Sequence, residues 1–183
     1  AYIDNCGTCD ENEFNDCINL EINLSVGANL VSFYALPIDN SIQSIFSDMD
    51  ISIIIGEAEG ALKIGDTWYG SLNQIKADKG YWIMNSVPQN ISIFEAVPTH
   101  SVQYDLHPGN NLISYPFSID QPIGNSISDQ YLNNIYAIAG SGNAARYMNN
   151  QWYGSLDTFE SSKGYWFVVY NSFIFEYSYL ENE

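Results

Sequence analysis

The feature that most constrains the fold of this chain is an internal repeat. The segment Trp68-Tyr-Gly-Ser-Leu72 recurs as Trp152-Tyr-Gly-Ser-Leu156, and Lys79-Gly-Tyr-Trp82 recurs as Lys163-Gly-Tyr-Trp166, both 84 residues later. Between positions 68–82 and 152–166, nine of fifteen residues are identical. Self-similarity over one spacing indicates a duplicated structural unit, because diverging copies must keep the residues that determine their fold.

The repeat extends upstream of these motifs and divides the chain. The matching positions, at an offset of 82, are Leu24, Gly27, Asn29, Leu30 and Ser32 with Leu106, Gly109, Asn111, Leu112 and Ser114. Ile38-Asp39 matches Ile119-Asp120 at an offset of 81, so small insertions lie in the connecting loops. We therefore expect an acidic, Cys-rich lead or linker at 1–20, a first β repeat at 21–99 and a second at 100–183. The link between the repeats is short, which predicts that the two copies touch.

Each repeat has the pattern of short strands. Residues 21–26 alternate polar and apolar, and residues 51–55 are rich in β-branched side chains and end at Gly56. Residues 41–46 suit one helical turn capped by Asn40 or Ser41. Gly80 and its counterpart are expected to supply a positive φ in a turn. The prediction is a mainly β fold of two tandem homologous sandwich-like or barrel-like modules, each with one short helical turn.

Composition excludes several classes of partner. Five Lys and Arg against 22 Asp and Glu give a formal charge of −17, which repels phosphate backbones and anionic lipid, so no nucleic-acid partner is expected. The most apolar stretch, 164–175, is far shorter than the roughly 20 residues of a membrane span, so no membrane insertion is expected. The acidity has two interpretations, either solubility in a salty or extracellular setting or cation binding.

The three cysteines, Cys6, Cys9 and Cys17, all lie in the lead. A zinc site would need a fourth ligand nearby, and a redox Cys-x-x-Cys would need a following helix, and the lead offers neither. Disulfide stapling in an extracellular setting is favoured, and the odd number leaves one cysteine free or paired outside this chain.

The lead also carries alternating oxygen-bearing side chains. Asp10, Asn12, Asn15 and Asp16 would suit Ca²⁺, which takes six to eight oxygen ligands. The segment lacks the glycine and final glutamate of an EF-hand loop. The alternative is a solvated acidic linker that needs no cofactor.

The repeated pairs Trp68/Tyr69 and Trp152/Tyr153 are the candidate ligand-binding residues. Neighbouring residues of a strand point to opposite faces, so one ring of each pair faces the core and the other faces outward. An outward ring could be a stacking platform for sugars. The alternative is that both rings fill the core or the contact between the copies.

Catalytic motifs are missing or out of context. The glycine-rich Gly140-Ser-Gly-Asn-Ala-Ala145 is followed by residues that lead into a strand, whereas a dinucleotide site needs a long helix there, so it is interpreted as a turn. The chain has neither Gly-x-Ser-x-Gly nor a thiol and His in one segment. We therefore predict that the chain is not an enzyme.

The motifs Gly-x-Asn-Leu-[Ile/Val]-Ser, Trp-Tyr-Gly-Ser-Leu and Lys-Gly-Tyr-Trp, with the lead Asp4-Asn-Cys-Gly-Thr-Cys-Asp10, resemble modules of large secreted proteins of marine bacteria and of structural proteins of marine cyanophages. The resemblance covers essentially the whole chain and carries no catalytic residues. It implies a C-terminal extracellular or virion-surface module.

Three functional hypotheses follow. The first is a non-enzymatic extracellular surface module for adhesion, display or carbohydrate binding, whose partner is a glycan or another surface protein. The second is a virion structural protein, such as a phage appendage, fibre or decoration subunit. The third is a secreted polysaccharide hydrolase built on paired carboxylates. In the first two, self-association or a larger parent assembly is expected, at a cell surface or virion surface.

Overall fold

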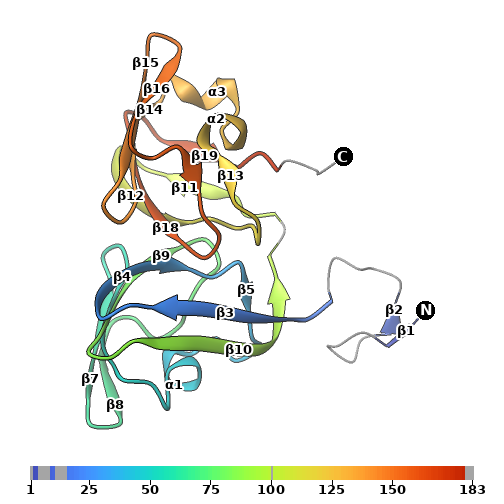
Figure 1. Cartoon of the computed structure of the whole chain (residues 1–183), viewed down its shortest axis with the longest axis vertical. Helices are drawn as coiled ribbons and strands as arrows, with labels where there is room; N and C mark the ends of the chain where they lie inside the picture. The colour runs from blue at the N-terminus through green and yellow to red at the C-terminus, as the bar shows by residue number, and fades with distance from the viewer. Residues whose placement is uncertain (1, 4–8, 11–15, 100, 180–183) are drawn as a thin grey trace.

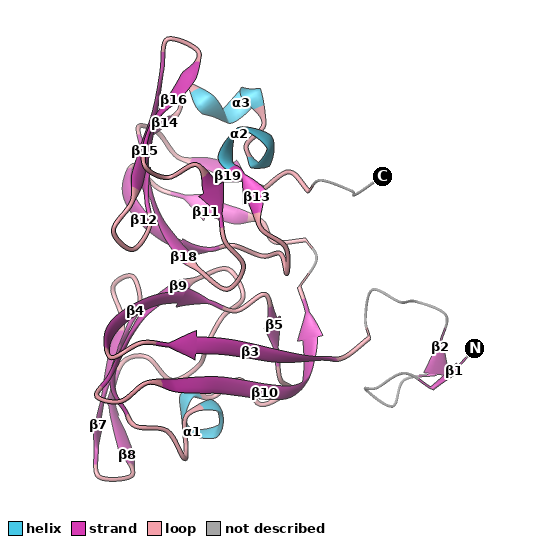
Figure 2. Cartoon of the chain, viewed as in Figure 1, coloured by secondary structure: helices cyan, strands magenta, loops and turns pink. Residues whose placement is uncertain are grey.

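The structure is a computed structural model that describes residues 2–3, 9–10, 16–99 and 101–179. Antiparallel strands make up most of its regular structure, and its three helices are short, so the predicted mainly β class is confirmed. Figure 1 and Figure 2 show two stacked bodies of strands, with the first half of the described chain below and the second half above. A two-residue pair, β1 (Tyr2–Ile3) with β2 (Cys9–Asp10), precedes them.

The first half is built on a five-stranded antiparallel sheet with a smaller sheet packed against it. In spatial order the large sheet contains β4 (Gly27–Ser32), β9 (Gly80–Asn85), β6 (Ile51–Ile55), β7 (Gly60–Ile64) and β8 (Thr67–Gly70). The smaller sheet contains β3 (Ile18–Leu24), β10 (Gln89–Pro98) and β5 (Ala35–Leu36). One core lies between them, because β3 buries every second residue toward the inward side chains of the large sheet.

The second half repeats this order of strands. Its large sheet contains β12 (Gly109–Ser114), β18 (Gly164–Val169), β14 (Ile135–Ala139), β15 (Ala144–Met148) and β16 (Gln151–Gly154). The smaller pairs are β11 (Tyr104–Leu106) with β19 (Phe173–Phe175), and β13 (Gln121–Pro122) with β17 (Thr158–Phe159). The register also agrees between halves, since Ser32 pairs with Gly80 and Ser114 pairs with Gly164.

The helices differ between the halves. In the first half α1 (Ile42–Ile45) is capped as predicted, because the Ser41 hydroxyl accepts a hydrogen bond from the Ser44 amide at 3.2 Å. The second half has α2 (Ile123–Ser126) and also α3 (Asp129–Leu132), where one helical turn was predicted. The extra turn places Leu132 in the core of its half.

The two halves meet along their edge strands β4 and β12. Val31 bridges Lys163 and Ile113 bridges Lys79, so each contact has a counterpart with the halves exchanged. The Ser32 amide donates to the Ser162 carbonyl at 2.9 Å, and its counterpart, the Ser114 amide, donates to the Asp78 carbonyl at 3.4 Å. The motif residues at this interface therefore join the halves to each other in a two-fold-like arrangement.

Candidate functional site

The Trp-Tyr-Gly-Ser-Leu segments form β8 and β16 and the turns that follow them. In the first copy Trp68 is half-buried against the core and meets Phe46 edge-on, with ring centroids 6.4 Å apart. In the second copy Trp152 is half-buried in the same way and meets Tyr147 edge-on at 5.3 Å. The tryptophan of each pair thus faces inward and packs with aromatic neighbours.

The glycine, serine and leucine of this motif have structural roles. A Cβ on Gly70 would lie 2.1 Å from the Gly60 carbonyl oxygen, and Gly70 has φ +148°. Gly154 repeats both properties, with a Cβ position 2.0 Å from the Ala144 carbonyl oxygen and φ +140°. Only glycine allows this close approach of two backbones. The next residue, Ser71, accepts a hydrogen bond from the Gly60 amide at 3.3 Å, and the following leucine is buried.

In the Lys-Gly-Tyr-Trp segments the tyrosine is a core residue. The hydroxyl of Tyr81 accepts a hydrogen bond from the Lys76 amide at 2.8 Å, and the hydroxyl of Tyr165 accepts one from the Glu160 amide at 2.7 Å. Burial raises the pKa of both phenols well above the ordinary value. Both tyrosines therefore stay neutral and hold the preceding loop in place.

The expected reason for Gly80 was wrong. Gly80 and Gly164 do not have a positive φ. Their backbones instead approach each other across the interface, because a Cβ on Gly80 would lie 3.2 Å from the Gly164 Cα and 2.9 Å from the Ile113 carbonyl oxygen. The glycine is required by packing between the halves.

Tyr69 and Tyr153 differ from the other motif residues in being largely exposed, at 57% and 46%. Each lies on the outward face of its strand, opposite Leu62 in the first half and opposite Arg146 in the second. The hairpins that carry them, β7–β8 and β15–β16, lie at opposite ends of the long axis in Figure 1. The candidate ligand-binding residues are thus divided into two inward tryptophans and two outward tyrosines at distant places.

The predicted calcium ligands fall mainly outside the described residues. Asn12 and Asn15 are outside them, as is the side chain of Asp10, and only Asp16 is described. Among the described residues no group of three or more His, Cys, Asp or Glu side chains could hold a metal ion. The calcium prediction is left untested by this geometry.

The same holds for most of the cysteine cluster. Cys6 and the side chain of Cys9 lie outside the described residues. Cys17 is buried at the start of β3, with its Sγ 3.3 Å from the Glu95 carbonyl oxygen. Disulfide stapling of the lead therefore stays a prediction.

An ion pair that the sequence did not indicate joins the halves. His107 Nε2 lies 2.5 Å from Glu57 Oε1, and His107 Nδ1 lies 3.0 Å from the Pro108 carbonyl oxygen. Both partners are acceptors, so the imidazole meets both only as a doubly protonated cation. The hydrogen bond to Pro108 and then that to Glu57 raise the pKa of His107 above its ordinary value.

Comparison of the chain with protein-family models, with curated proteins and with solved structures finds no match. In the part of the chain that the structure describes, no helix is long and apolar enough to cross a membrane. The fold therefore defines a class, a mainly β protein with two halves of matching strand order, and functional assignment depends on the site itself.

Proposed function

We propose that this chain is a non-enzymatic extracellular surface module that attaches to carbohydrate through Tyr69 and Tyr153. The observation that carries the proposal is the exposure of these two rings within motifs whose other residues are used for packing. A residue repeated in both copies without a packing role is accounted for by contact with something outside the chain. A phenol ring offers a flat apolar face and a polar hydroxyl, which suits a sugar ring.

The placement of the two rings supports attachment to extended or repeated ligands. They lie on hairpins at opposite ends of the molecule, so one sugar ring cannot contact both (Figure 1). Two separate weak sites on one chain increase attachment to a surface that carries many copies of the ligand. The proposal therefore concerns polymeric or densely displayed glycans.

A glycan array tests the proposal, with the full chain, Tyr69→Ala, Tyr153→Ala and the double variant. Tyr170→Ala is the matched control, because Tyr170 is 54% exposed but lies outside the repeated motifs. Each single substitution should reduce attachment to an array spot, and the double variant should lose about 10-fold or more, with the control unchanged.

Two results would contradict the proposal. If the double variant attached to glycans as strongly as the unaltered chain, the two tyrosines would not be part of the binding site. Failure of the unaltered chain to attach to any glycan would remove carbohydrate binding itself and favour the virion structural alternative. Turnover of a polysaccharide by the chain would contradict the non-enzymatic part and favour the hydrolase hypothesis.

A further inference from the structure

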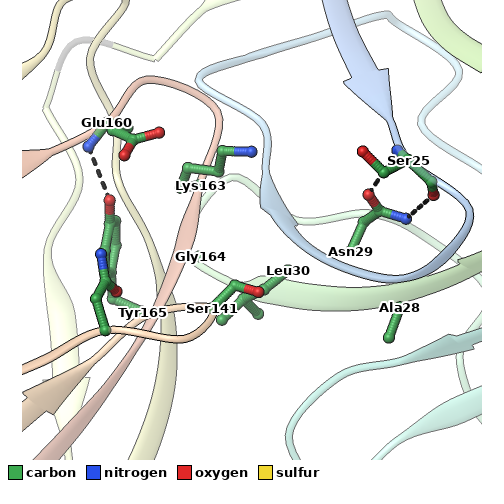
Figure 3. A pocket seen from close by; sticks show the side chains of 10 residues that line it. Ser25, Ala28, Asn29, Leu30, Ser141, Glu160, Lys163, Gly164 and Tyr165 are labelled. Atoms are coloured by element: carbon green, nitrogen blue, oxygen red, sulfur yellow. Dashed lines mark hydrogen bonds between the residues drawn. The ribbon is translucent and has the colours of Figure 1, made fainter.

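A cavity of about 290 Å³ opens between the two halves, next to the edge strand β4. Figure 3 shows that the turn before β4 and the β4 residues face the loop before β18 across this space. Its lining residues are Ser25, Ala28, Asn29, Leu30, Ser141, Asn143, Glu160, Lys163, Gly164 and Tyr165. The cavity lies on one side of the two-fold-like interface, so the other side offers a direct comparison.

On the other side the corresponding place is occupied by a carboxylate of the chain itself. Glu57 Oε2 accepts a hydrogen bond from the Leu112 amide at 2.8 Å, and Glu57 Oε1 lies 2.5 Å from His107 Nε2. Lys79 is close enough to lower the pKa of His107 electrostatically. A carboxylate at the edge of β12 therefore accepts a hydrogen bond from a backbone N–H and lies beside positive charge.

The cavity side lacks the carboxylate and keeps two of the receiving groups, the Leu30 amide and Lys163, while Ser25 stands at the position of His107. Glu57 follows Gly56 after β6, and the residue that follows Gly140 after β14 is Ser141. Among the described residues no hydrogen bond joins Ser141 to Leu30, the counterpart of Leu112. A serine side chain is too short to present a carboxylate to that strand edge.

The Leu30 amide points into this space. The Ser32 amide leaves the sheet to reach the second half, and residues two apart on a strand point the same way. Because β4 is the edge of its sheet, no further strand of that sheet covers the Leu30 N–H. Figure 3 shows the Lys163 side chain, the counterpart of Lys79, extending across the cavity toward the first half.

One acid also lines the cavity. Glu160 precedes Lys163 in the same loop, and no ion pair joins the two side chains among the described residues. Glu160 opposes the entry of an anion and limits its affinity, since like charges repel.

We propose that this cavity binds the carboxylate group of a small ligand, which takes the position that the Glu57 carboxylate holds on the opposite side. The Leu30 N–H donates one hydrogen bond to it, and the Lys163 ammonium supplies a charge-assisted contact. The site is distinct from Tyr69 and Tyr153 and does not depend on the function proposed for them.

The test follows the Leu30 amide of the full chain, labelled with ¹⁵N, by NMR at constant ionic strength. Sodium acetate and sodium glucuronate are the probes, and glucose and sodium chloride are the controls. Both carboxylates should shift the Leu30 amide with millimolar affinity, at up to about 100 mM probe, while the controls do not. Equal affinities assign recognition to the carboxylate alone, and tighter binding of glucuronate assigns it to a sugar acid; both support the proposal.

Four variants make the test specific. Lys163→Gln should weaken acetate binding about 5-fold, whereas Lys76→Gln, which removes an exposed lysine of the opposite half, should leave it unchanged. Glu160→Gln should tighten binding about 3-fold by removing the opposing charge. Ser141→Glu should place an internal carboxylate in the cavity, move the Leu30 amide to its bound position without probe and abolish the titration.

The proposal is overturned if no carboxylate shifts the Leu30 amide in either the unaltered chain or Glu160→Gln. It is also overturned if folded Ser141→Glu still responds to acetate as the unaltered chain does, or if Lys76→Gln and Lys163→Gln weaken binding equally.

Discussion

Gly80 and Gly164 face each other at the contact between the two halves. A Cβ on Gly80 would lie 3.2 Å from the Gly164 Cα, and a Cβ on Gly164 would lie 3.1 Å from the Gly80 Cα. Neither position has room for a side chain, because backbone atoms on both sides form the contact. The glycine of the Lys-Gly-Tyr-Trp motif therefore belongs to the joining of the halves.

Gly80→Ala is expected to destabilise the chain by about 2 kcal/mol, because the added methyl group overpacks the interface against backbone that cannot move aside. Thermal unfolding should show a melting temperature lower by about 4–8 °C. Gly124→Ala is the matched control, since a Cβ there meets nothing within 4 Å and Gly124 lies in α2. A melting temperature of Gly80→Ala equal to that of the control would contradict the packing at this interface.

The ion pair of His107 with Glu57 predicts a pH dependence of stability. The pKa of His107 is raised in the folded chain, so its stabilising contribution is complete below the unfolded pKa and is lost as pH rises through the folded value. The ring is exposed, and such pairs contribute less than about 1 kcal/mol. Between pH 6 and pH 8.5, urea unfolding should show a smaller decrease in the free energy of unfolding for His107→Gln than for the unaltered chain. An equal decrease in both would exclude this ion pair as the source of the pH dependence.

Two buried tyrosines in the second half should respond in opposite directions to loss of the hydroxyl. The Tyr177 hydroxyl is buried and has no hydrogen-bond partner among the described residues, so Tyr177→Phe should stabilise by about 1 kcal/mol. The Tyr104 hydroxyl lies 2.8 Å from the Ser114 hydroxyl, so Tyr104→Phe should destabilise by about 1 kcal/mol. Chemical denaturation of the two variants provides the comparison, and a reversed order would be incompatible with these contacts.

The tight turn between β15 and β16 offers a test of backbone conformation. Asn149 and Asn150 both have a positive φ, of 50° and 62°, as a two-residue type I′ hairpin turn requires. Asn150→Gly should leave stability equal or raise it by about 0.5 kcal/mol, and Asn150→Ala should lower it by about 1 kcal/mol, because alanine pays the full cost of this conformation. The free energies of unfolding in urea test this prediction, and an Asn150→Ala variant more stable than the unaltered chain would refute the turn assignment.

Local pattern was enough to predict the mainly β fold, a helix cap at Asn40 or Ser41, and the turn between β14 and β15. These features depend on neighbouring residues, on the alternation of a strand and on the side chain of a cap. The second helix of the second half was missed because residues 129–132 have too few apolar positions to show a helical period.

The sites between the halves could not be predicted in the same way. The repeat aligns Glu57 with Ser141, but this difference has meaning only when β4 and β12 are known to be the strands that meet. Likewise, Gly80 was assigned to a turn because sequence shows a need for glycine without showing which backbone approaches it. Contacts between residues far apart in sequence, such as Glu57 with His107 and Gly80 with Gly164, depend on topology, which the motifs alone do not state.

The contact of β4 and β12 with the opposite half has a consequence for how far such a duplication can extend. In each half, β4 or β12 is an edge strand of the large sheet, and the other half packs against that edge. A third unit of the same kind could not make this contact, because the β4 and β12 edges are both already in use. Addition of units through this contact therefore stops at two. The molecule is a closed pair, and any longer array must be joined through other surfaces.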